Sequence, residues 1–135
     1  MFDNDYCSRF HSKTLLRYHM IFSTKFRYKF LYQIRDTVFK AFRYTESISV
    51  FQILTMELDW DHIHILITFP PKYSITQVVR RLKQTTTYYI YEHELAYLRR
   101  WYWGNKKLLW THGYFCSTIG SVSEDTVRRY RENQG

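Results

Sequence analysis

The sequence predicts an α+β fold, with a ferredoxin-like antiparallel sheet and helices packed on it in a single domain. Strand-like and helix-like segments follow one another in the order β-α-β-β-α-β-α, with an irregular stretch before the last strand. The connections are short, and an acidic bend joins the two central strands as a hairpin. The chain has 135 residues, of which 45% are apolar, and this is enough for one buried core. We expect residues 1–14 to form a polar tail and residues 15–135 to form the domain.

The first two elements are predicted from composition and spacing. Residues 15–24 are rich in aromatic and aliphatic side chains, which is typical of a strand. Ile34, Val38 and Phe42 then recur every four residues. Because that interval places them on one face of a helix, we expect an amphipathic helix over residues 31–45.

A β-hairpin is predicted in the middle of the chain. Residues 47–58 and 62–69 are β-branched and alternating, and the acidic bend of residues 59–61 lies between them. Pro70 and Pro71 end the second strand, because proline has no N–H to donate to a neighbouring strand.

A long helix is predicted to follow the hairpin. Ser74 and Gln77 have the spacing of a capping box, in which each residue bonds the backbone of the other. Apolar residues at helical intervals come next, namely Ile75, Val78, Val79, Leu82 and Tyr89. Residues 94–109 form a basic, aromatic segment for which the pattern favours no single element.

The last part of the chain predicts a strand and a final helix. Residues 114–119 resemble a strand, and Gly120 is expected to end it. Ser121 and Glu124 repeat the capping-box spacing. We therefore expect a helix from Ser121 to about Gln134.

The charge pattern indicates an anionic partner. Twenty Lys and Arg residues against twelve Asp and Glu give a net charge of +8, and nine of the bases fall between Arg9 and Arg43. Aromatic residues make up 20% of the chain and interleave with the bases, as in residues 25–30 and 99–103. Cations that follow a phosphate backbone, beside rings that stack unpaired bases, are typical of proteins that bind single-stranded nucleic acid. Ordinary solvated faces and an aromatic core remain the alternative explanation.

Several protein classes are excluded by the same composition. The longest apolar runs, such as residues 63–69, are too short to span a bilayer, so no membrane association is expected. The first residues lack the pattern of a secretory signal, and the two cysteines, Cys7 and Cys116, have no disulfide or zinc-binding spacing. A cytoplasmic protein with reduced thiols is therefore expected.

Two groups of residues could form a reactive site. His62 and His64 alternate with isoleucines in the third strand, so both imidazoles should leave one face of it, about 7 Å apart. On the final helix, Tyr130 and Gln134 are four residues apart and share a face. A divalent cation needs three or more protein donors, and a helix docked across the sheet could bring a carboxamide oxygen to the two imidazoles. It would also place the phenol next to the metal. Paired structural histidines and a packed tyrosine are the simpler alternative.

The motifs around these residues resemble a known family in order and spacing. They are residues 18–28 (YHMIFSTKFRY), residues 61–64 (DHIH), Ser74-Ile75, residues 109–120 (LWTHGYFCSTIG) and residues 123–134 (SEDTVRRYRENQ). Together they resemble the single-tyrosine HUH transposases of the insertion sequence 200/605 family, over nearly the whole chain. One departure is Trp60, where that family usually carries proline.

The resemblance implies a metal-dependent DNA strand transferase whose catalytic domain is residues 15–135. It implies that His62, His64 and Gln134 hold Mg²⁺ or Mn²⁺ and that Tyr130 is the nucleophile. Cleavage of single-stranded DNA would then leave a 5′-phosphotyrosine and a free 3′-OH, which another strand can rejoin. Asp61 would either orient a histidine or close the turn.

The resemblance also implies partners. Excision needs two cleavages and each chain has one such tyrosine, so a homodimer is expected, with the site assembled within one subunit or between two. DNA hairpins at element ends would bind a basic, aromatic surface, for which the candidates are Lys25, Arg27, Lys29, Arg80, Arg81 and Lys83.

Two other hypotheses for the function stay open. One is a non-catalytic module that binds single-stranded nucleic acid, and the other is a domesticated relative that acts on chromosomal repeats.

Overall fold

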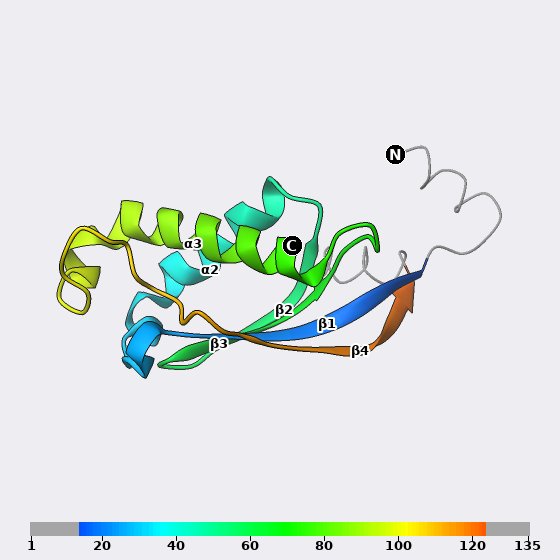
Figure 1. Cartoon of the computed structure of the whole chain (residues 1–135), viewed down its shortest axis with the longest axis horizontal. Coiled ribbons are helices and arrows are strands. Elements are labelled where there is room, and N and C mark those ends of the chain that lie inside the picture. The colour runs from blue at the N-terminus through cyan, green and yellow to red at the C-terminus, as the bar shows by residue number, and fades with distance from the viewer. Residues whose placement is uncertain (1–13, 124–135) are drawn as a thin grey trace.

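A four-stranded antiparallel sheet with two α-helices on one face forms the part of the chain that the computed structural model describes, residues 14–123 (Figure 1). The strands are β1 (Thr14–Ser23), β2 (Gln52–Leu58), β3 (His62–Thr68) and β4 (Phe115–Ser123). The helices are α2 (Arg35–Ser47) and α3 (Ile75–Leu98), and two short 3-10 turns, η1 (Lys25–Arg27) and η2 (Leu31–Ile34), lie between β1 and α2.

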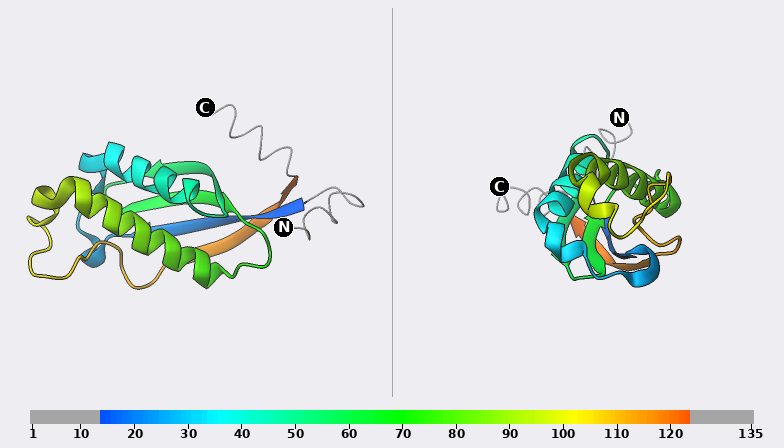
Figure 2. Two further views of the ribbon diagram at one scale, coloured as in Figure 1. Left: turned by 90° about the horizontal axis from the view of Figure 1, so that it is seen from above. Right: turned by 90° about the vertical axis from the view of Figure 1, so that its left-hand side faces the viewer.

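The order of the strands across the sheet is β2-β3-β1-β4. Each neighbouring pair is antiparallel, with β3 between β2 and β1. With helices inserted after the first and third strands, this is the ferredoxin-like topology, and the predicted fold is confirmed. The end-on view in Figure 2 (right) shows that α2 and α3 cover one side of the sheet.

The core lies between the sheet and this helix layer. Ile63, Ile65 and Ile67 of β3 are at most 1% exposed. They pack in one apolar cluster with residues of β1 and both helices, which include Met20, Phe22, Val38, Phe42, Val78 and Leu82. Because side chains of a strand alternate between its two faces, the residues between these isoleucines leave the opposite side of the sheet.

The capping box of α3 is confirmed. The Ser74 hydroxyl oxygen accepts a hydrogen bond from the backbone N–H of Gln77 at 3.0 Å, and the Ser74 N–H donates to Gln77 Oε1 at 2.8 Å. These bonds satisfy two donors at the helix start. The helix continues to Leu98, five residues into the segment that the sequence left unassigned. Among the described helices, α3 included, none has the length and apolarity needed to cross a membrane.

Two predicted boundaries in the first half are wrong. The helix expected over residues 31–45 starts as the 3-10 turn η2 and continues as α2 to Ser47. The second strand therefore starts at Gln52 and not at residue 47. Apolar β-branched residues fit a strand, but the last helical turn and the connection to β2 take up residues 47–51.

The sequence predicts that Gly120 ends the last strand, and this prediction is wrong. β4 continues through it to Ser123, and the register with β1 shifts between Arg17 and Tyr18, opposite this glycine. Gly120 has φ of +142°, a conformation that suits glycine and lets the strand bend without ending. The predicted helix start at Ser121 is also wrong, since Ser121 lies in β4. Residues 122 and 123 also lie in β4, and residues 124–134 of the predicted final helix lie outside the described residues.

Candidate metal centre and nucleic-acid interface

Two imidazoles lie side by side at the start of β3, on the sheet face that the helices leave uncovered. The ring centroids of His62 and His64 are 4.8 Å apart and both rings are half-buried. Ile63 and Ile65, the buried residues that alternate with them, fix this orientation through the core. The strand pattern thus places both histidines on one face, as the alternation predicts.

Asp61 holds the ring of His62. A carboxylate can only accept a hydrogen bond, so the 2.7 Å contact between His62 Nδ1 and Asp61 Oδ1 places the ring proton on Nδ1. The second carboxylate oxygen of Asp61 contacts the guanidinium of Arg27 at 3.0 Å. The hydrogen bond from His62 is the main cause that lowers the pKa of Asp61, and the charge of Arg27 adds to it. Metal binding by His62 is then left to Nε2, which lies 4.0 Å from Asp59 Oδ2.

The backbone of Asp61 ties the bend between β2 and β3 to the end of β1. Its backbone carbonyl accepts a hydrogen bond from the N–H of Thr24 at 2.9 Å. The sequence offered two roles for this residue, to orient a histidine or to close the turn. In the structure the side chain of Asp61 contacts the histidine, whereas the bend itself is closed by the N–H of Asp59, which donates to the carbonyl of His62 at 2.9 Å.

His19, which the sequence pattern did not single out, lies beside the histidine pair. Its Nε2 lies 3.1 Å from Nδ1 of His64, and the two rings stack at a centroid distance of 5.2 Å. The ring of Phe115 packs against the other side of His19 at 6.2 Å. Tyr18 and Met20 point into the core, so alternation along β1 would have placed His19 on the histidine face.

The surroundings of His64 favour a neutral ring. Burial is the main cause that lowers its pKa, and the nearby charges of His62 and His19 lower it further. A neutral imidazole whose Nδ1 faces His19 can present the lone pair of Nε2 to a metal ion.

The donors in this part of the chain fit a first-row divalent ion but do not complete a site. Imidazole nitrogens suit Mn²⁺ and its neighbours in the series. Within residues 14–123 no group of three or more His, Cys, Asp or Glu side chains could hold a metal ion. The predicted third donor, Gln134, and the predicted nucleophile, Tyr130, both lie outside the described residues.

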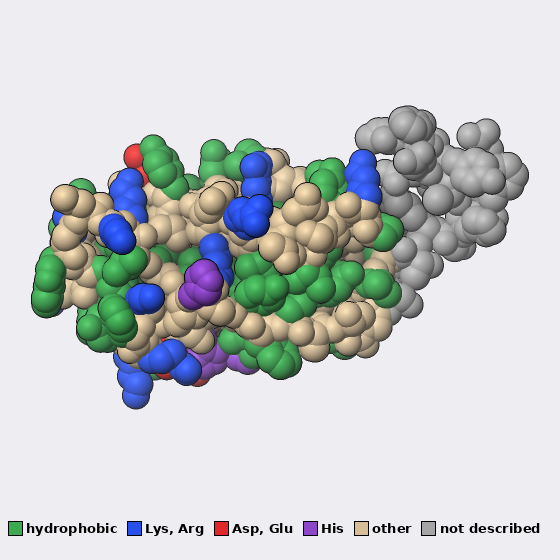
Figure 3. All heavy atoms as spheres, in the orientation of Figure 1, with side chains coloured by type: hydrophobic (Ala, Val, Ile, Leu, Met, Phe, Trp, Pro, Cys, Tyr) green, Lys and Arg blue, Asp and Glu red, His purple; other side chains and the backbone are tan. Residues whose placement is uncertain are grey.

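Three of the predicted DNA-binding residues surround the turn that follows β1. Lys25 is half-buried, whereas Arg27 and Lys29 are exposed. Arg27 is bonded to Asp61 and therefore belongs to the surroundings of His62. Figure 3 shows histidine side chains along the lower edge of the molecule, below the helix layer, with lysine and arginine side chains next to them.

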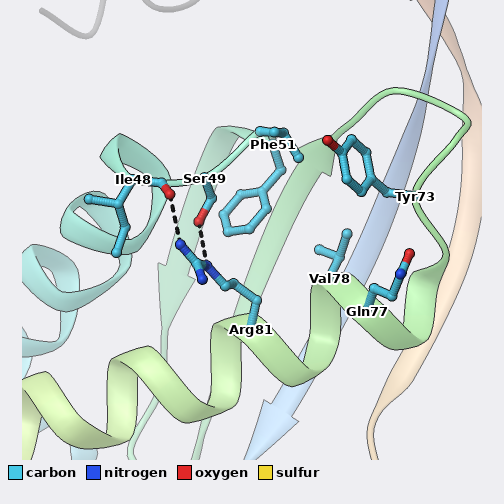
Figure 4. A pocket seen from close by; sticks show the side chains of 8 residues that line it. Ile48, Ser49, Phe51, Tyr73, Gln77, Val78 and Arg81 are labelled. Atoms are coloured by element: carbon cyan, nitrogen blue, oxygen red, sulfur yellow. Dashed lines mark hydrogen bonds between the residues drawn. The ribbon is translucent and has the colours of Figure 1, made fainter.

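The other three lie on α3, the helix that covers the opposite face of the sheet. Arg80 is exposed. Arg81 donates to the carbonyl of Ile48 at 2.7 Å and to the hydroxyl of Ser49 at 3.0 Å, beside a hollow of about 290 Å³ (Figure 4). Lys83 donates to three backbone carbonyls, those of residues 111–113, at 2.8 to 3.0 Å. Contact with DNA stays a prediction for all six residues.

Part of the aromatic content serves the core. Trp101 stacks on the buried ring of Phe30 at 5.4 Å, and the buried Tyr102 donates its hydroxyl to the carbonyl of Lys25 at 2.6 Å. Trp103, the next residue, is 81% exposed. The aromatic residues of segment 99–103 are therefore of two kinds: Trp101 and Tyr102 pack against the core, and Trp103 is exposed to solvent.

Comparison with known proteins identifies relatives of this chain. A family model described as "Transposase IS200 like" matches residues 12–134. The ISDra2 transposase TnpA of Deinococcus radiodurans is 27% identical over 122 residues, which cover 88% of this chain and 84% of that protein. The transposase for insertion sequence element IS200 of Salmonella typhimurium is 30% identical over 113 residues, which cover 82% of this chain and 71% of that one.

Solved structures share the fold. A Deinococcus radiodurans R1 protein assigned as a transposase superposes with a TM-score of 0.60 at 26% identity, covering 89% of this chain and 91% of its own. A REP-associated tyrosine transposase bound to a REP hairpin superposes with a TM-score of 0.56 at 15% identity, covering 87% of this chain and 61% of its own. The family model spans nearly the entire sequence, and the ferredoxin-like sheet is the one found in these structures. The chain belongs to the IS200-like transposase family.

Proposed function

We propose that this transposase cleaves and rejoins single-stranded DNA at the ends of an insertion sequence, in a metal-dependent reaction through a 5′-phosphotyrosine. The observation that carries the proposal is the pair of half-buried imidazoles, His62 and His64, each with Nδ1 engaged by a neighbouring side chain. Rings held in this way are preorganised to bind one cation through the remaining nitrogens. Membership of a transposase family supports DNA as the substrate.

The metal ligands that we propose are His62, His64 and the carboxamide oxygen of Gln134, with Mg²⁺ or Mn²⁺ as the ion. When bound, the ion supplies Lewis-acid stabilisation of the charge that develops on the scissile phosphate. Asp61 and His19 fix the orientation of the two rings, and Arg27 holds Asp61 in place.

Tyr130 is the nucleophile in this proposal. Its phenol oxygen forms a bond to phosphorus while the bond from phosphorus to the 3′-oxygen breaks, and that oxygen leaves as a 3′-hydroxyl after taking up a proton. One phosphodiester is exchanged for another, so the energy of the bond is kept. A second 3′-hydroxyl can then reverse the step and join two strands without ATP.

The DNA partner that we propose is a single strand with hairpins at the element ends. The net charge of +8 favours binding to a phosphate backbone. The tyrosine transposase that shares this fold was solved bound to a REP hairpin, which supports a hairpin as the kind of DNA that this sheet can bind. The exposed cations of the turn after β1 would contact phosphates near the histidine pair.

Tyr130→Phe tests the nucleophile. We expect this variant to lose the covalent protein–DNA species, because phenylalanine has no hydroxyl, while its hairpin affinity stays within about twofold of wild type since one hydroxyl is a small part of a charged interface. The measurement is a denaturing gel of labelled single strands taken from the DNA that flanks the gene, with Mg²⁺ or Mn²⁺. Tyr88→Phe, which removes the hydroxyl of an exposed tyrosine on α3, is the control. An adduct that persists in Tyr130→Phe would refute the assignment.

A homodimer is proposed because two cleavages are needed for excision and each chain brings one Tyr130. We expect sedimentation equilibrium at micromolar protein to give a mass of twice 16.8 kDa. The dimer would be contradicted if the protein alone had the mass of one chain and if DNA that carries the hairpins of both element ends bound only one chain.

His19→Leu tests whether the hydrogen bond to His64 positions a metal ligand. Loss of such an outer contact typically weakens metal binding by about 10- to 100-fold, and we expect a loss of that size in Mn²⁺ affinity, measured by calorimetry without DNA. His19→Gln should recover part of the affinity, because its carboxamide oxygen can accept the same hydrogen bond. His93→Leu, in which an exposed histidine of α3 is removed, serves as the control. Equal Mn²⁺ affinity for wild type and His19→Leu would rule out the positioning role.

A further inference from the structure

The turn that follows β1 has an unusual backbone. Phe26 has φ of 65° and ψ of 10°, and Arg27 has φ of 56°, so two consecutive residues adopt the left-handed conformation. Neither is glycine, and a side chain with a β-carbon is strained in this conformation. Such strain persists only where the surrounding structure imposes it, and it is concentrated at functional sites.

Four hydrogen-bonded contacts hold the backbone of this turn in its conformation. The N–H of Lys25 donates to the carbonyl of Leu109 at 2.7 Å, and the hydroxyl of Tyr102 donates to the carbonyl of Lys25 at 2.6 Å. The N–H of Arg27 donates to the carbonyl of Thr24 at 2.9 Å, and the Arg27 guanidinium is bonded to Asp61. The turn is therefore fixed on both sides of Phe26.

As a result, the phenyl ring of Phe26 is exposed to solvent. Phe26 is 62% exposed, although burial of a phenylalanine is strongly favourable. Its ring borders Tyr28 at 5.5 Å and Tyr102 at 6.4 Å, and the ammonium of Lys25 lies 5.4 Å from the ring centroid. The exposed ring thus has one cation beside it, the ammonium of Lys25, while the guanidinium of Arg27, the next residue, is bonded to Asp61.

This ring lies at the histidine end of the sheet. Thr24, at the start of the turn, donates to the carbonyl of Asp61, and Arg27 contacts the carboxylate that orients His62. In Figure 1, η1 and the bend between β2 and β3 lie at the same end of the sheet. Arg27, the residue after Phe26, is thus linked through Asp61 to the proposed metal ligand His62.

We propose that Phe26 is a stacking platform for one unpaired base of the DNA strand next to the scissile phosphate, with Lys25 and Arg27 beside the adjoining phosphates. The proposal rests on the proposed function, because it needs single-stranded DNA at the histidine pair. Every base offers a flat π face, so stacking needs no particular sequence. Lys25 and Arg27 directly precede and follow Phe26 in the chain, and their positive charges suit a base flanked by phosphates and disfavour a purely apolar protein segment.

The affinity of the protein for single-stranded DNA tests the stacking platform. It is measured in the Tyr130→Phe variant, in which no cleavage by this tyrosine can occur. Oligonucleotides from the flanking DNA would carry an abasic site at each position around the cleavage point in turn. Stacking on one aromatic ring accounts for roughly a 5- to 150-fold gain in affinity. We expect one abasic position to lose affinity by this factor, and Phe26→Ala to show the same loss with intact DNA but no further loss with that abasic strand.

Two further variants separate stacking from folding. Phe26→Trp should keep the affinity and the sensitivity to the abasic site. Phe26→Gly should lose both while its thermal midpoint is at or above that of Phe26→Ala, because glycine accepts a positive φ without strain. Tyr88→Ala is the matched control: Tyr88 is 58% exposed and carries Lys107 at 4.9 Å over its ring, but it lies on α3. It should bind all strands like the background.

The results distinguish this proposal from the proposed function. Equal affinity of Phe26→Ala and its background for every strand would overturn the platform, even if wild type forms the Tyr130 adduct. The platform would also be overturned if Phe26→Ala changed the oligomeric state but not the response to abasic sites, since the ring would then lie between two copies of the chain. Coupling between Phe26 and one base in a protein whose wild type forms no adduct would support the platform and refute the proposed reaction.

Discussion

The site depends on the two-residue period of β3. Buried isoleucines alternate with histidines over residues 62–67, and the isoleucines are fixed in the core under α2 and α3. A shift of one residue in the register would bury both imidazoles and expose the apolar row, which the core strongly disfavours. Packing on one side of the sheet therefore determines the position of two reactive groups on the other side.

The second level of organisation is the set of side chains that orient the rings. Asp61 and His19 each engage Nδ1 of one histidine, and Arg27 links Asp61 to the turn after β1. The left-handed backbone at Phe26 and Arg27 costs roughly 1–3 kcal/mol per residue, and the hydrogen bonds of this turn offset that cost. The same segment thus holds a metal-site neighbour in place and exposes an aromatic ring and two cations.

Local patterns predicted much of this fold. The alternation of β3 and the capping box at Ser74 depend only on residues close in sequence, and both are found as expected. Alternation along β1 indicates the face on which His19 lies, but its contact with His64 depends on the pairing of β1 with β3, which joins residues 45 positions apart. Gly120 continues β4 because a register shift beside Arg17 accommodates it, which again is a property of the paired strands.

Charge was the least specific of the sequence signals. Lys25, Arg27 and Lys83 are all basic residues in aromatic surroundings, yet the structure uses them differently. Lys83 donates to three backbone carbonyls and Arg27 to an aspartate at the histidine pair, whereas the ammonium of Lys25 lies over an exposed ring. Which cation has an internal partner follows from tertiary contacts that the linear charge pattern does not contain.

Pulsed electron paramagnetic resonance of the protein loaded with one equivalent of Mn²⁺ tests the metal centre most directly. Two imidazole nitrogens should couple to the ion in the wild-type protein, and a single nitrogen should remain in either His62→Ala or His64→Ala. A spectrum of the wild-type protein without coupling to any imidazole nitrogen, at a concentration where Mn²⁺ is bound, would contradict the account.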